Sequence, residues 1–271
     1  MRIAFIGGGN MATALISGLD RTPPGPEWIH VSEPGEQARK RLSETFRVGC
    51  YSRAEPAVEN AEVIVLAVKP QVMPAVLDEI GGMVGREQLV LSIAAGITVA
   101  TLAKALGPDV PLVRAMPNTP ALIGKGISAA FAAPSCSPGQ REQADTVLRV
   151  AGACLWIEDE ALMDVVTAVS GSGPAYFFLL TEALRDAGTK LGLPFETATQ
   201  LALHTAAGAG AMGIESDVDV SELRRRVTSP GGTTQAALEA LAAGRFDELV
   251  NAAVRAATQR GRELARQDKS S

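Results

Sequence analysis

The sequence has few of the residues that build metal sites and disulfide frameworks. Its three cysteines, Cys50, Cys136 and Cys154, form no C-x-x-C pair, and this odd number predicts free thiols in a reducing cytoplasm. Its two histidines, His30 and His204, each lie far along the chain from a second candidate ligand. We therefore expect no zinc site.

A basic surplus and long apolar runs are also missing. The net charge is −5 and the pI is near 5.2, which argues against nucleic acid as the main partner. No apolar run reaches the roughly 20 residues that span a bilayer, and the N-terminal apolar stretch is too short for a signal peptide. We expect a cytoplasmic protein with no membrane partner. Its 271 residues, 46% of them hydrophobic, suffice for one large domain or two ordinary ones.

The chain begins with a pattern that is typical of dinucleotide binding. Arg2–Ile6 is an apolar run suited to a buried strand, and Gly7–Ala12 follows with the spacing G-x-G-x-x-A before a helical pattern. Gly7 permits the tight turn, Gly9 lets a pyrophosphate approach the backbone, and Ala12 keeps the helix close to the strand. The helix N-terminus then offers free N–H groups to the phosphates.

Apolar runs and helical patterns alternate up to about Ile157. After the first strand, the runs that predict strands are residues 28–31, 62–68, 89–93 and 112–116, with weaker ones at 126–131 and 153–157. Helices are expected at residues 35–45 and 138–150. This alternation predicts an α/β fold with a mostly parallel, doubly wound Rossmann sheet.

The end of the second strand is where an adenine ribose is expected. Glu33 is suited to accept hydrogen bonds from a ribose 2′-hydroxyl, which favours NAD. Ser32, with Arg39 and Lys40 nearby, is suited to a 2′-phosphate, which favours NADP. Ordinary surface positions are an equally good interpretation of all four residues.

Further candidates follow other strands of the predicted sheet. Lys69 comes after the run 62–68, where Pro70 ends the strand, and so lies at the carboxyl edge or is simply solvated. Ala94 and Ala95 are small enough to let a flat nicotinamide approach the backbone. Asn118 follows the run 112–116 and either faces the cleft or caps a turn.

The composition changes after residues 158–160, beyond which only helices are expected. They are predicted at residues 161–168, 174–191, 195–214, 221–227, 233–243 and 246–266. Several carry apolar residues on more than one face, and such helices need burial on every side. About 110 residues supply little interior for that, so the pattern predicts a subunit interface.

Two segments of the helical region have an unusual composition. Residues 170–176 and 227–234 are each rich in glycine and hydroxyl groups, and each is expected to form a turn that leads into a helix. Simple N-capping is one interpretation. The other is that Ser229–Thr234 forms a nest for a carboxylate, which two such turns in a helical domain favour.

These motifs together resemble the pyrroline-5-carboxylate reductase family over essentially the whole chain. The segments that carry the resemblance are Phe5–Ala12, Ala67–Pro70, Met116–Pro120, Ser170–Tyr176 and Ser229–Thr234. The resemblance implies a Rossmann domain at residues 1–157 and a helical substrate-binding and dimerisation domain at 158–271. It also implies a homodimer whose helical domains interlock, or a ring of such dimers.

The resemblance further implies a site and a reaction. The residues expected to bind the cofactor, NADPH or alternatively NADH, are Gly7, Gly8, Gly9, Asn10, Met11, Ala12, Ser32, Ala67, Val68, Lys69, Pro70, Ala94, Ala95 and Asn118. The residues expected to bind the substrate are Glu160, Ser229, Gly232, Thr233 and Thr234, with Ser229 and Thr234 as the catalytic pair. The family reduces a cyclic imine to L-proline, which needs no strong base because a protonated imine accepts hydride readily.

Two other functions are compatible with parts of the sequence. A β-hydroxyacid-type dehydrogenase would need a catalytic lysine in the helical domain, but Lys190 lies at a helix end beside Gly192 and Pro194. A dinucleotide-sensing dimer without turnover would not need the carboxylate-like nest at Ser229–Thr234. Both alternatives are therefore less favoured than the reductase.

Overall fold

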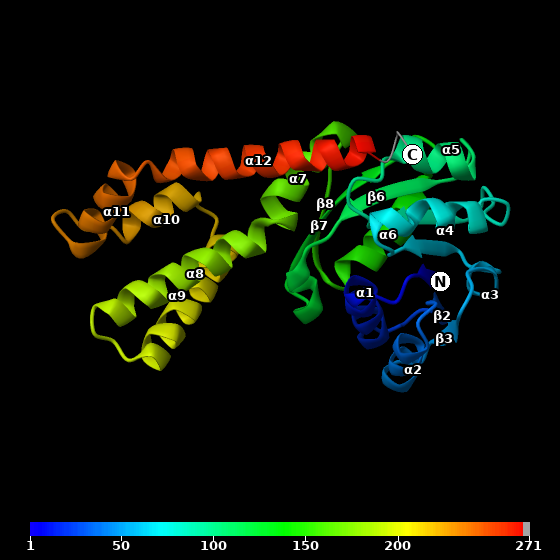
Figure 1. The fold of residues 1–271 in the computed structure, drawn as a ribbon, viewed down its shortest axis with the longest axis horizontal. Coiled ribbons are helices and arrows are strands. Elements are labelled where there is room, and N and C mark those ends of the chain that lie inside the picture. The colour runs from blue at the N-terminus through cyan, green and yellow to red at the C-terminus, as the bar shows by residue number, and fades with distance from the viewer. Residues whose placement is uncertain (268–271) are drawn as a thin grey trace. The chain divides into compact units, whose positions relative to one another are not determined.

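The computed structural model describes residues 1–267, which form two compact units (Figure 1). Among the described residues, unit 1 comprises Met1–Ser172 and residues 257–267, and unit 2 comprises Gly173–Ala256. The units separate between Ser172 and Gly173, later than the change of composition at residue 157. The division into a cofactor domain at residues 1–157 and a substrate and dimerisation domain at residues 158–271 stays a prediction. The last four residues of the second domain, 268–271, lie outside the described part.

A single eight-stranded sheet forms the centre of unit 1. Its strands are β1 (Arg2–Ile6), β2 (Trp28–Ser32), β3 (Gly49–Tyr51), β4 (Val63–Leu66), β5 (Leu89–Ser92), β6 (Leu112–Met116), β7 (Gly126–Ala132) and β8 (Gly152–Trp156). They lie in the order β3-β2-β1-β4-β5-β6-β7-β8, and every neighbouring pair is parallel except β6 and β7. The predicted doubly wound, mostly parallel sheet is confirmed.

The strand order reverses direction between β1 and β4. From β1 the chain goes outwards to β2 and β3, and then returns to place β4 on the other side of β1. In doubly wound sheets the ligand crevice lies at this switch point, outside the carboxyl ends of the strands. The topology therefore locates a candidate site at the segments that follow β1, β2 and β4.

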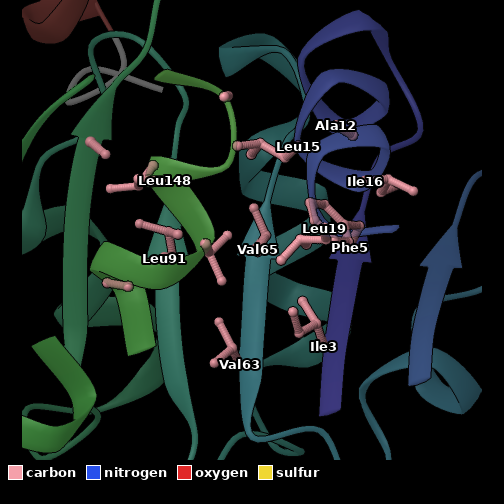
Figure 2. Packing of buried hydrophobic residues seen from close by; sticks show 14 of the residues in the cluster. Ile3, Phe5, Ala12, Leu15, Ile16, Leu19, Val63, Val65, Leu91 and Leu148 are labelled. Atoms are coloured by element: carbon pink, nitrogen blue, oxygen red, sulfur yellow. The ribbon is translucent and has the colours of Figure 1, made fainter. Parts of the chain in front are cut away.

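Helices cover both faces of the sheet and bury its apolar side chains. The helical elements of unit 1 are α1 (Asn10–Arg21), α2 (Glu36–Thr45), α3 (Glu55–Val58), η1 (Pro70–Val72), α4 (Met73–Ile80), α5 (Val99–Leu106), η2 (Thr119–Ile123), α6 (Pro138–Arg149), η3 (Glu160–Leu162), α7 (Met163–Val166), η4 (Thr167–Gly171) and, from Ala257, the last part of α12 (Phe246–Gln267). On one face, Phe5 and Val65 of the strands lie among Leu15 and Leu19 of α1, with Leu148 of α6 in the same cluster (Figure 2). On the other face, α3, α4 and α5 bury a second cluster that contains Ile64 and Met73.

Several elements of unit 1 were not predicted, namely η1, α4, α5 and η2, the strand β3 and the helix α3. The strand β3 has three residues, and its pairing with β2 places Gly49 opposite His30. The helix α3 has four residues. Neither β3 nor α3 is long enough to show a hydrophobic period in the sequence. Their conformation therefore depends on contacts with the sheet.

Unit 2 is entirely helical in the part of the chain that the structure describes. It contains α8 (Gly173–Lys190), α9 (Phe195–Glu215), α10 (Val220–Arg226), α11 (Thr233–Ala243) and the first part of α12 (Phe246–Gln267). Helices α8 and α9 lie side by side and form a hairpin (Figure 1). Its turn includes Gly192 at φ +103°, and the Leu193 N–H donates to the Gly188 carbonyl at 3.1 Å. The predicted helices are confirmed within one or two residues.

Most large apolar side chains of unit 2 are exposed. The exposed ones include Phe177, Phe178, Leu179, Leu180, Leu184, Leu191, Phe195, Leu201, Leu203, Met212, Ile214, Val220, Val227, Leu241, Leu249 and Val250. Ala198 and Ala202 of α9 are among its few buried apolar residues. The apolar residues thus lie on faces that this chain does not cover by itself.

One helical run is long and apolar enough to cross a membrane. Residues Glu160–Lys190 contain an 18-residue window of mean hydropathy 1.2. Polar residues interrupt this run, so the sequence shows no continuous apolar stretch there. Length and composition alone are weak support for a membrane span, because core and interface helices pass the same test.

Candidate active site

The glycine-rich loop after β1 combines one structural glycine with one that faces open space. Gly7 has φ +99°, and a Cβ there would lie 2.8 Å from the Ala67 carbonyl oxygen, so the backbone itself requires glycine. Gly9 has an ordinary φ of −70° as the N-cap residue of α1, and a Cβ there would meet no atom within 4 Å. Since the fold does not need glycine at residue 9, the free space above it fits a ligand.

A pocket of about 390 Å³ lies at the carboxyl ends of β1, β2 and β4. Its lining includes six of the residues expected to bind a cofactor, namely Gly7, Gly9, Ser32, Ala67, Val68 and Lys69. Ser52, Val72, Val76 and Glu79 also line it and were not predicted, because they follow β3 and β4 without a motif. The position of the pocket is the one expected for a dinucleotide at the switch point.

A larger open hollow of about 540 Å³ lies elsewhere on unit 1. It is lined by Arg2, Glu62 and Gln88 among others, which precede or begin β1, β4 and β5. It therefore lies at the amino ends of the strands, where doubly wound folds do not bind their ligands.

Glu33 braces the glycine-rich loop. Its Oε2 accepts a hydrogen bond from the Gly8 N–H at 3.0 Å, and its Oε1 accepts one from the Gly35 N–H at 2.9 Å. Arg39 of α2 donates from Nη1 to the carbonyl oxygens of Glu33 and Pro34, at 2.7 and 2.6 Å. Both carboxylate oxygens of Glu33 are thus already engaged with backbone N–H groups.

The other residues expected to bind the cofactor lie outside the pocket lining. Asn10, Met11 and Ala12 begin α1, and Ala12 is fully buried against the sheet. Pro70 begins η1, directly after Lys69. Ala94 and Ala95 follow β5, the strand beside β4, and so lie at the same edge of the sheet. Their contact with a cofactor stays a prediction.

Asn118 is buried and connects two elements. Its Nδ2 donates to the Ser170 carbonyl of η4 at 3.1 Å, and its Oδ1 accepts from the Ile127 N–H of β7 at 2.9 Å. This side chain therefore holds η4 against the sheet near the end of β6. Its assignment to the cofactor stays a prediction.

The segment from Ser170 to Gly173 is not a turn, and that prediction is wrong. Residues Thr167–Gly171 form the π-helix η4, and the Ser172 N–H donates to the Thr167 carbonyl at 2.8 Å. A Cβ at Gly171 would lie 2.8 Å from Cε of Met116, so the glycine permits close packing on β6. Helical bonding thus continues up to Ser172, directly before α8 begins at Gly173.

Glu160 forms an ion pair with the buried side chain of Arg114. Its Oε1 accepts from Nη1 of Arg114 at 2.9 Å and from the Val99 N–H at 2.9 Å. Arg114 lies on β6 with a side chain that is 5% exposed, and Val99 begins α5. The carboxylate therefore joins β6 and α5 to η3, and its expected role at the substrate stays a prediction.

The segment Ser229–Thr234 forms the expected turn at the start of α11. Gly231 has φ +71°, and the Gly232 N–H donates to the Ser229 carbonyl at 3.0 Å. No side chain caps α11 at Gly232, and within residues 1–267 the hydroxyls of Ser229, Thr233 and Thr234 make no hydrogen bond. The first N–H groups of α11 and three hydroxyls are thus available to an anionic ligand.

Two of the three arginines before this turn share one carboxylate, that of Glu222. Nε of Arg225 and Nε of Arg226 both donate to the carboxylate of Glu222, at 2.7 and 2.8 Å. Those hydrogen bonds hold the pKa of Glu222 below its usual value, so the carboxylate stays charged near neutral pH. The exposed basic run therefore shares the single negative charge of Glu222 and keeps a net positive charge.

Cysteine nucleophiles and metal ligands do not contribute to this site. Burial raises the pKa of Cys50 and Cys136, and burial followed by the charge of Asp145 raises that of Cys154 to about 12. None of the three is a thiolate near neutral pH. Among the described residues, no three His, Cys, Asp or Glu side chains are grouped as metal ligands.

Two protein-family models match the chain. The model described as pyrroline-5-carboxylate reductase dimerisation matches residues 160–264. The model described as NADP oxidoreductase, coenzyme F420-dependent, matches residues 2–96. The first covers η3 to α12, and the second covers the glycine-rich loop and the pocket.

The chain is similar to known proteins over nearly its whole length. It is 50% identical to a pyrroline-5-carboxylate reductase of Pseudomonas aeruginosa over 266 residues, which cover 98% of this chain and 97% of the relative. A solved structure of a pyrroline-5-carboxylate reductase from Coxiella burnetii has a TM-score of 0.93 at 38% identity, with 97% and 98% of the two chains covered. The pyrroline carboxylate reductase of Plasmodium falciparum, solved with NADP bound, has a TM-score of 0.85 at 30% identity and covers 98% of each chain.

Proposed function

The chain belongs to the pyrroline-5-carboxylate reductase family, and we propose that it reduces the cyclic imine pyrroline-5-carboxylate to L-proline with NADPH. The observation that carries this proposal is the likeness to named reductases over 98% of the chain. The pocket at the switch point supports an NAD(P)H-dependent oxidoreductase, because its lining includes the open position at Gly9. NADH remains the alternative hydride donor.

The cofactor residues are assigned from the loop and the strand ends. We assign Gly7–Ala12, Ser32, Ala67–Pro70, Ala94–Ala95 and Asn118 to NADPH. Gly9 lets the pyrophosphate reach the N-terminus of α1, where N–H groups and the helix dipole favour an anion. The bound cofactor supplies the hydride.

The substrate residues are assigned from the turn before α11. We assign the carboxylate of the imine to Ser229 and to the segment Gly232–Thr234, in which the N–H groups of Thr233 and Thr234 begin α11 without a side-chain cap. The Thr234 hydroxyl is placed at the ring nitrogen. When hydride adds to the carbon of the protonated imine, the C=N bond becomes a single bond and the nitrogen keeps its proton, so the site needs orientation and no strong base. Glu160 is kept as a residue near the substrate.

Self-association follows from the family and from the exposed apolar helices. We propose a homodimer, or a ring of dimers, formed through residues 158–271, with residues 1–157 as the cofactor domain. The sixteen exposed apolar residues given above for unit 2 support this assignment, because helices of that composition need burial on more sides than one chain offers. We further propose a cytoplasmic location, which the three unpaired cysteines favour.

The reaction is tested by following nicotinamide absorbance with the imine and either cofactor. Turnover that depends on the imine supports the reductase, and turnover of a β-hydroxy acid in its place would favour the dehydrogenase alternative. Binding of the nucleotide without turnover of either substrate would favour the sensing dimer.

The substrate residues are tested by single substitutions in the turn. Thr234→Ala should lower kcat about three- to tenfold, because a neutral hydrogen bond contributes about 0.5–1.5 kcal/mol. Ser229→Ala should mainly raise KM for the imine. Thr228→Ala is the matched control, since the Thr228 hydroxyl donates to the Arg224 carbonyl of α10. Lower melting temperatures with unchanged kinetics in the first two variants would show that both residues only cap the helix.

A further inference from the structure

We infer that Arg39 binds the 2′-phosphate of NADPH and sets the preference for NADPH over NADH, an inference that rests on the proposed function. Arg39 lies on α2, and its Nη1 donates to the carbonyl oxygens of Glu33 and Pro34. Both of those residues line the pocket and follow β2, where the adenosine ribose lies in doubly wound folds. The guanidinium is therefore held against two residues that line the ribose end of the pocket, although Arg39 itself is not part of the lining.

The two backbone contacts leave most of the guanidinium available. Nε and Nη2 of Arg39 make no hydrogen bond or ion pair with any described residue, and the side chain is only partly exposed. A guanidinium held by one nitrogen presents the other two as a planar pair of donors, which matches the oxygens of a phosphate. The side chain is thus already oriented, and binding costs little further conformational entropy.

The two lysines nearby, Lys40 and Lys69, are less suitable than Arg39 for binding the 2′-phosphate. Lys40 is 74% exposed, and its Nζ lies 3.9 Å from Glu44 one helical turn away. Lys69 lines the pocket but follows β4, the strand on the other side of β1 from β2. A charge at Lys69 therefore serves parts of the nucleotide that NADH and NADPH share.

Glu33 does not oppose this assignment. An acid after β2 favours NAD when its carboxylate accepts the ribose hydroxyls. Here the two carboxylate oxygens accept the Gly8 and Gly35 N–H groups, so the acid supports the loop instead. Arg39, on the helix that follows, has no ion-pair partner among the described residues. An anion beside Glu33 would therefore meet a positive charge.

The inference is tested by binding measurements that need no turnover. Calorimetry with NADPH, NADH, adenosine 2′,5′-bisphosphate and AMP would be carried out on the full chain and on Arg39→Gln. We expect the variant to lose about ten- to a hundredfold in affinity for the two ligands that carry the 2′-phosphate, because hydrogen bonds to charged groups are among the strongest. Affinity for NADH and AMP should change less than twofold.

Two control variants separate a direct contact from a structural effect. Lys40→Gln should leave all four affinities unchanged, because Lys40 is exposed and paired along its own helix. Arg39→Lys keeps the charge and should restore part of the preference. Equal losses for NADPH and NADH in Arg39→Gln would mean that Arg39 supports only the backbone of Glu33 and Pro34, which overturns the inference.

The outcome for the proposed function is independent of this result. If the unmodified chain reduces the imine but Arg39→Gln keeps the full preference for NADPH, the function stands and the inference fails. If the unmodified chain binds both phosphate-bearing ligands no better than their counterparts, the inference fails as well. If the unmodified chain reduces no imine with either cofactor, the proposed function fails.

Discussion

The two units of this chain treat their apolar residues in opposite ways. In unit 1, Ile3, Phe5 and Leu91 have no exposed surface, and helices cover both faces of the sheet. In unit 2, Phe177 and Phe178 are 66% and 67% exposed, although the unit is made of long helices. Unit 1 has a complete core of its own, whereas the helices of unit 2 need a second surface to cover them.

The two proposed binding sites also belong to different units. The pocket assigned to NADPH is built on the rigid sheet of unit 1, whose strand ends are fixed by ladder hydrogen bonds. The turn assigned to the imine carboxylate belongs to the unit with little core. We therefore expect nucleotide binding to survive changes that abolish assembly, and imine reduction to depend on it.

A charge placed on the exposed apolar face of unit 2 is the strongest test of this difference between the two units. Phe178→Asp should convert the dimer or larger ring into monomers that have lost imine reduction but still bind NADPH. Burying a phenylalanine contributes about 1.5–3 kcal/mol, and a twofold interface counts each substitution twice. Light scattering measures the change, and Met83→Asp, at a 41% exposed residue of unit 1, is the matched control. A charged variant that keeps its full assembly would contradict the comparison.

The glycine-rich loop offers a substitution that affects binding without affecting the fold of unit 1. Gly9→Val should abolish nucleotide binding and leave the melting temperature nearly unchanged, because the added atoms enter open space. Calorimetry with NADPH and thermal unfolding measure the two effects. Gly7→Ala is the contrasting variant: its φ of +99° and the nearby Ala67 carbonyl should make it cost about 1–3 kcal/mol of stability. Unchanged affinity in Gly9→Val would refute the assignment of this pocket.

The ion pair between Glu160 and the buried Arg114 of unit 1 offers a test that separates a structural role of Glu160 from a role at the substrate. Glu160→Ala leaves Arg114 buried without its partner and should lower the free energy of unfolding by about 3 kcal/mol. Denaturant unfolding measures this loss. Glu158→Ala removes an exposed partner of Arg141 and should have little effect. A raised KM for the imine at unchanged stability would assign Glu160 to the substrate instead.

The cysteines provide the test with the smallest effect on the enzyme, and all three lie in unit 1. At pH 8 the thiolate fraction of Cys154, with a pKa of about 12, is roughly 1000-fold below that of an ordinary thiol with a pKa of 9.0. Because the pKa is raised, alkylation of Cys154 should keep increasing with pH above 9. Mass spectrometry of labelled peptides should show Cys154 as the slowest of the three, with no loss of activity. Rapid labelling of Cys154 at pH 8 would show that β8 opens and that unit 1 is less compact than its core implies.

The sequence by itself determined the elements whose signal is local. The strand, turn and helix from Arg2 to Arg21 follow from an apolar run and three glycines, and Lys69 lies at the carboxyl edge because Pro70 ends a buried run. The exposed apolar helices of unit 2 were also visible as a surplus of apolar residues over the available interior. Such features need only neighbouring residues, and periodicity reports them.

Only the tertiary structure decided the features that depend on contacts between distant residues. The hydrogen bonds of Glu33 to Gly8, of Asn118 to Ser170 and of Glu160 to Arg114 each join segments that are far apart along the chain. The Glu33 carboxylate therefore supports the glycine-rich loop, although its place in the sequence suited it to a ribose. The glycine-rich segment that contains Ser170 is held against the sheet as part of a π-helix. A sequence pattern lists the donors and acceptors of each segment, but packing decides which of them meet, since a buried polar group takes the partner that the fold places beside it.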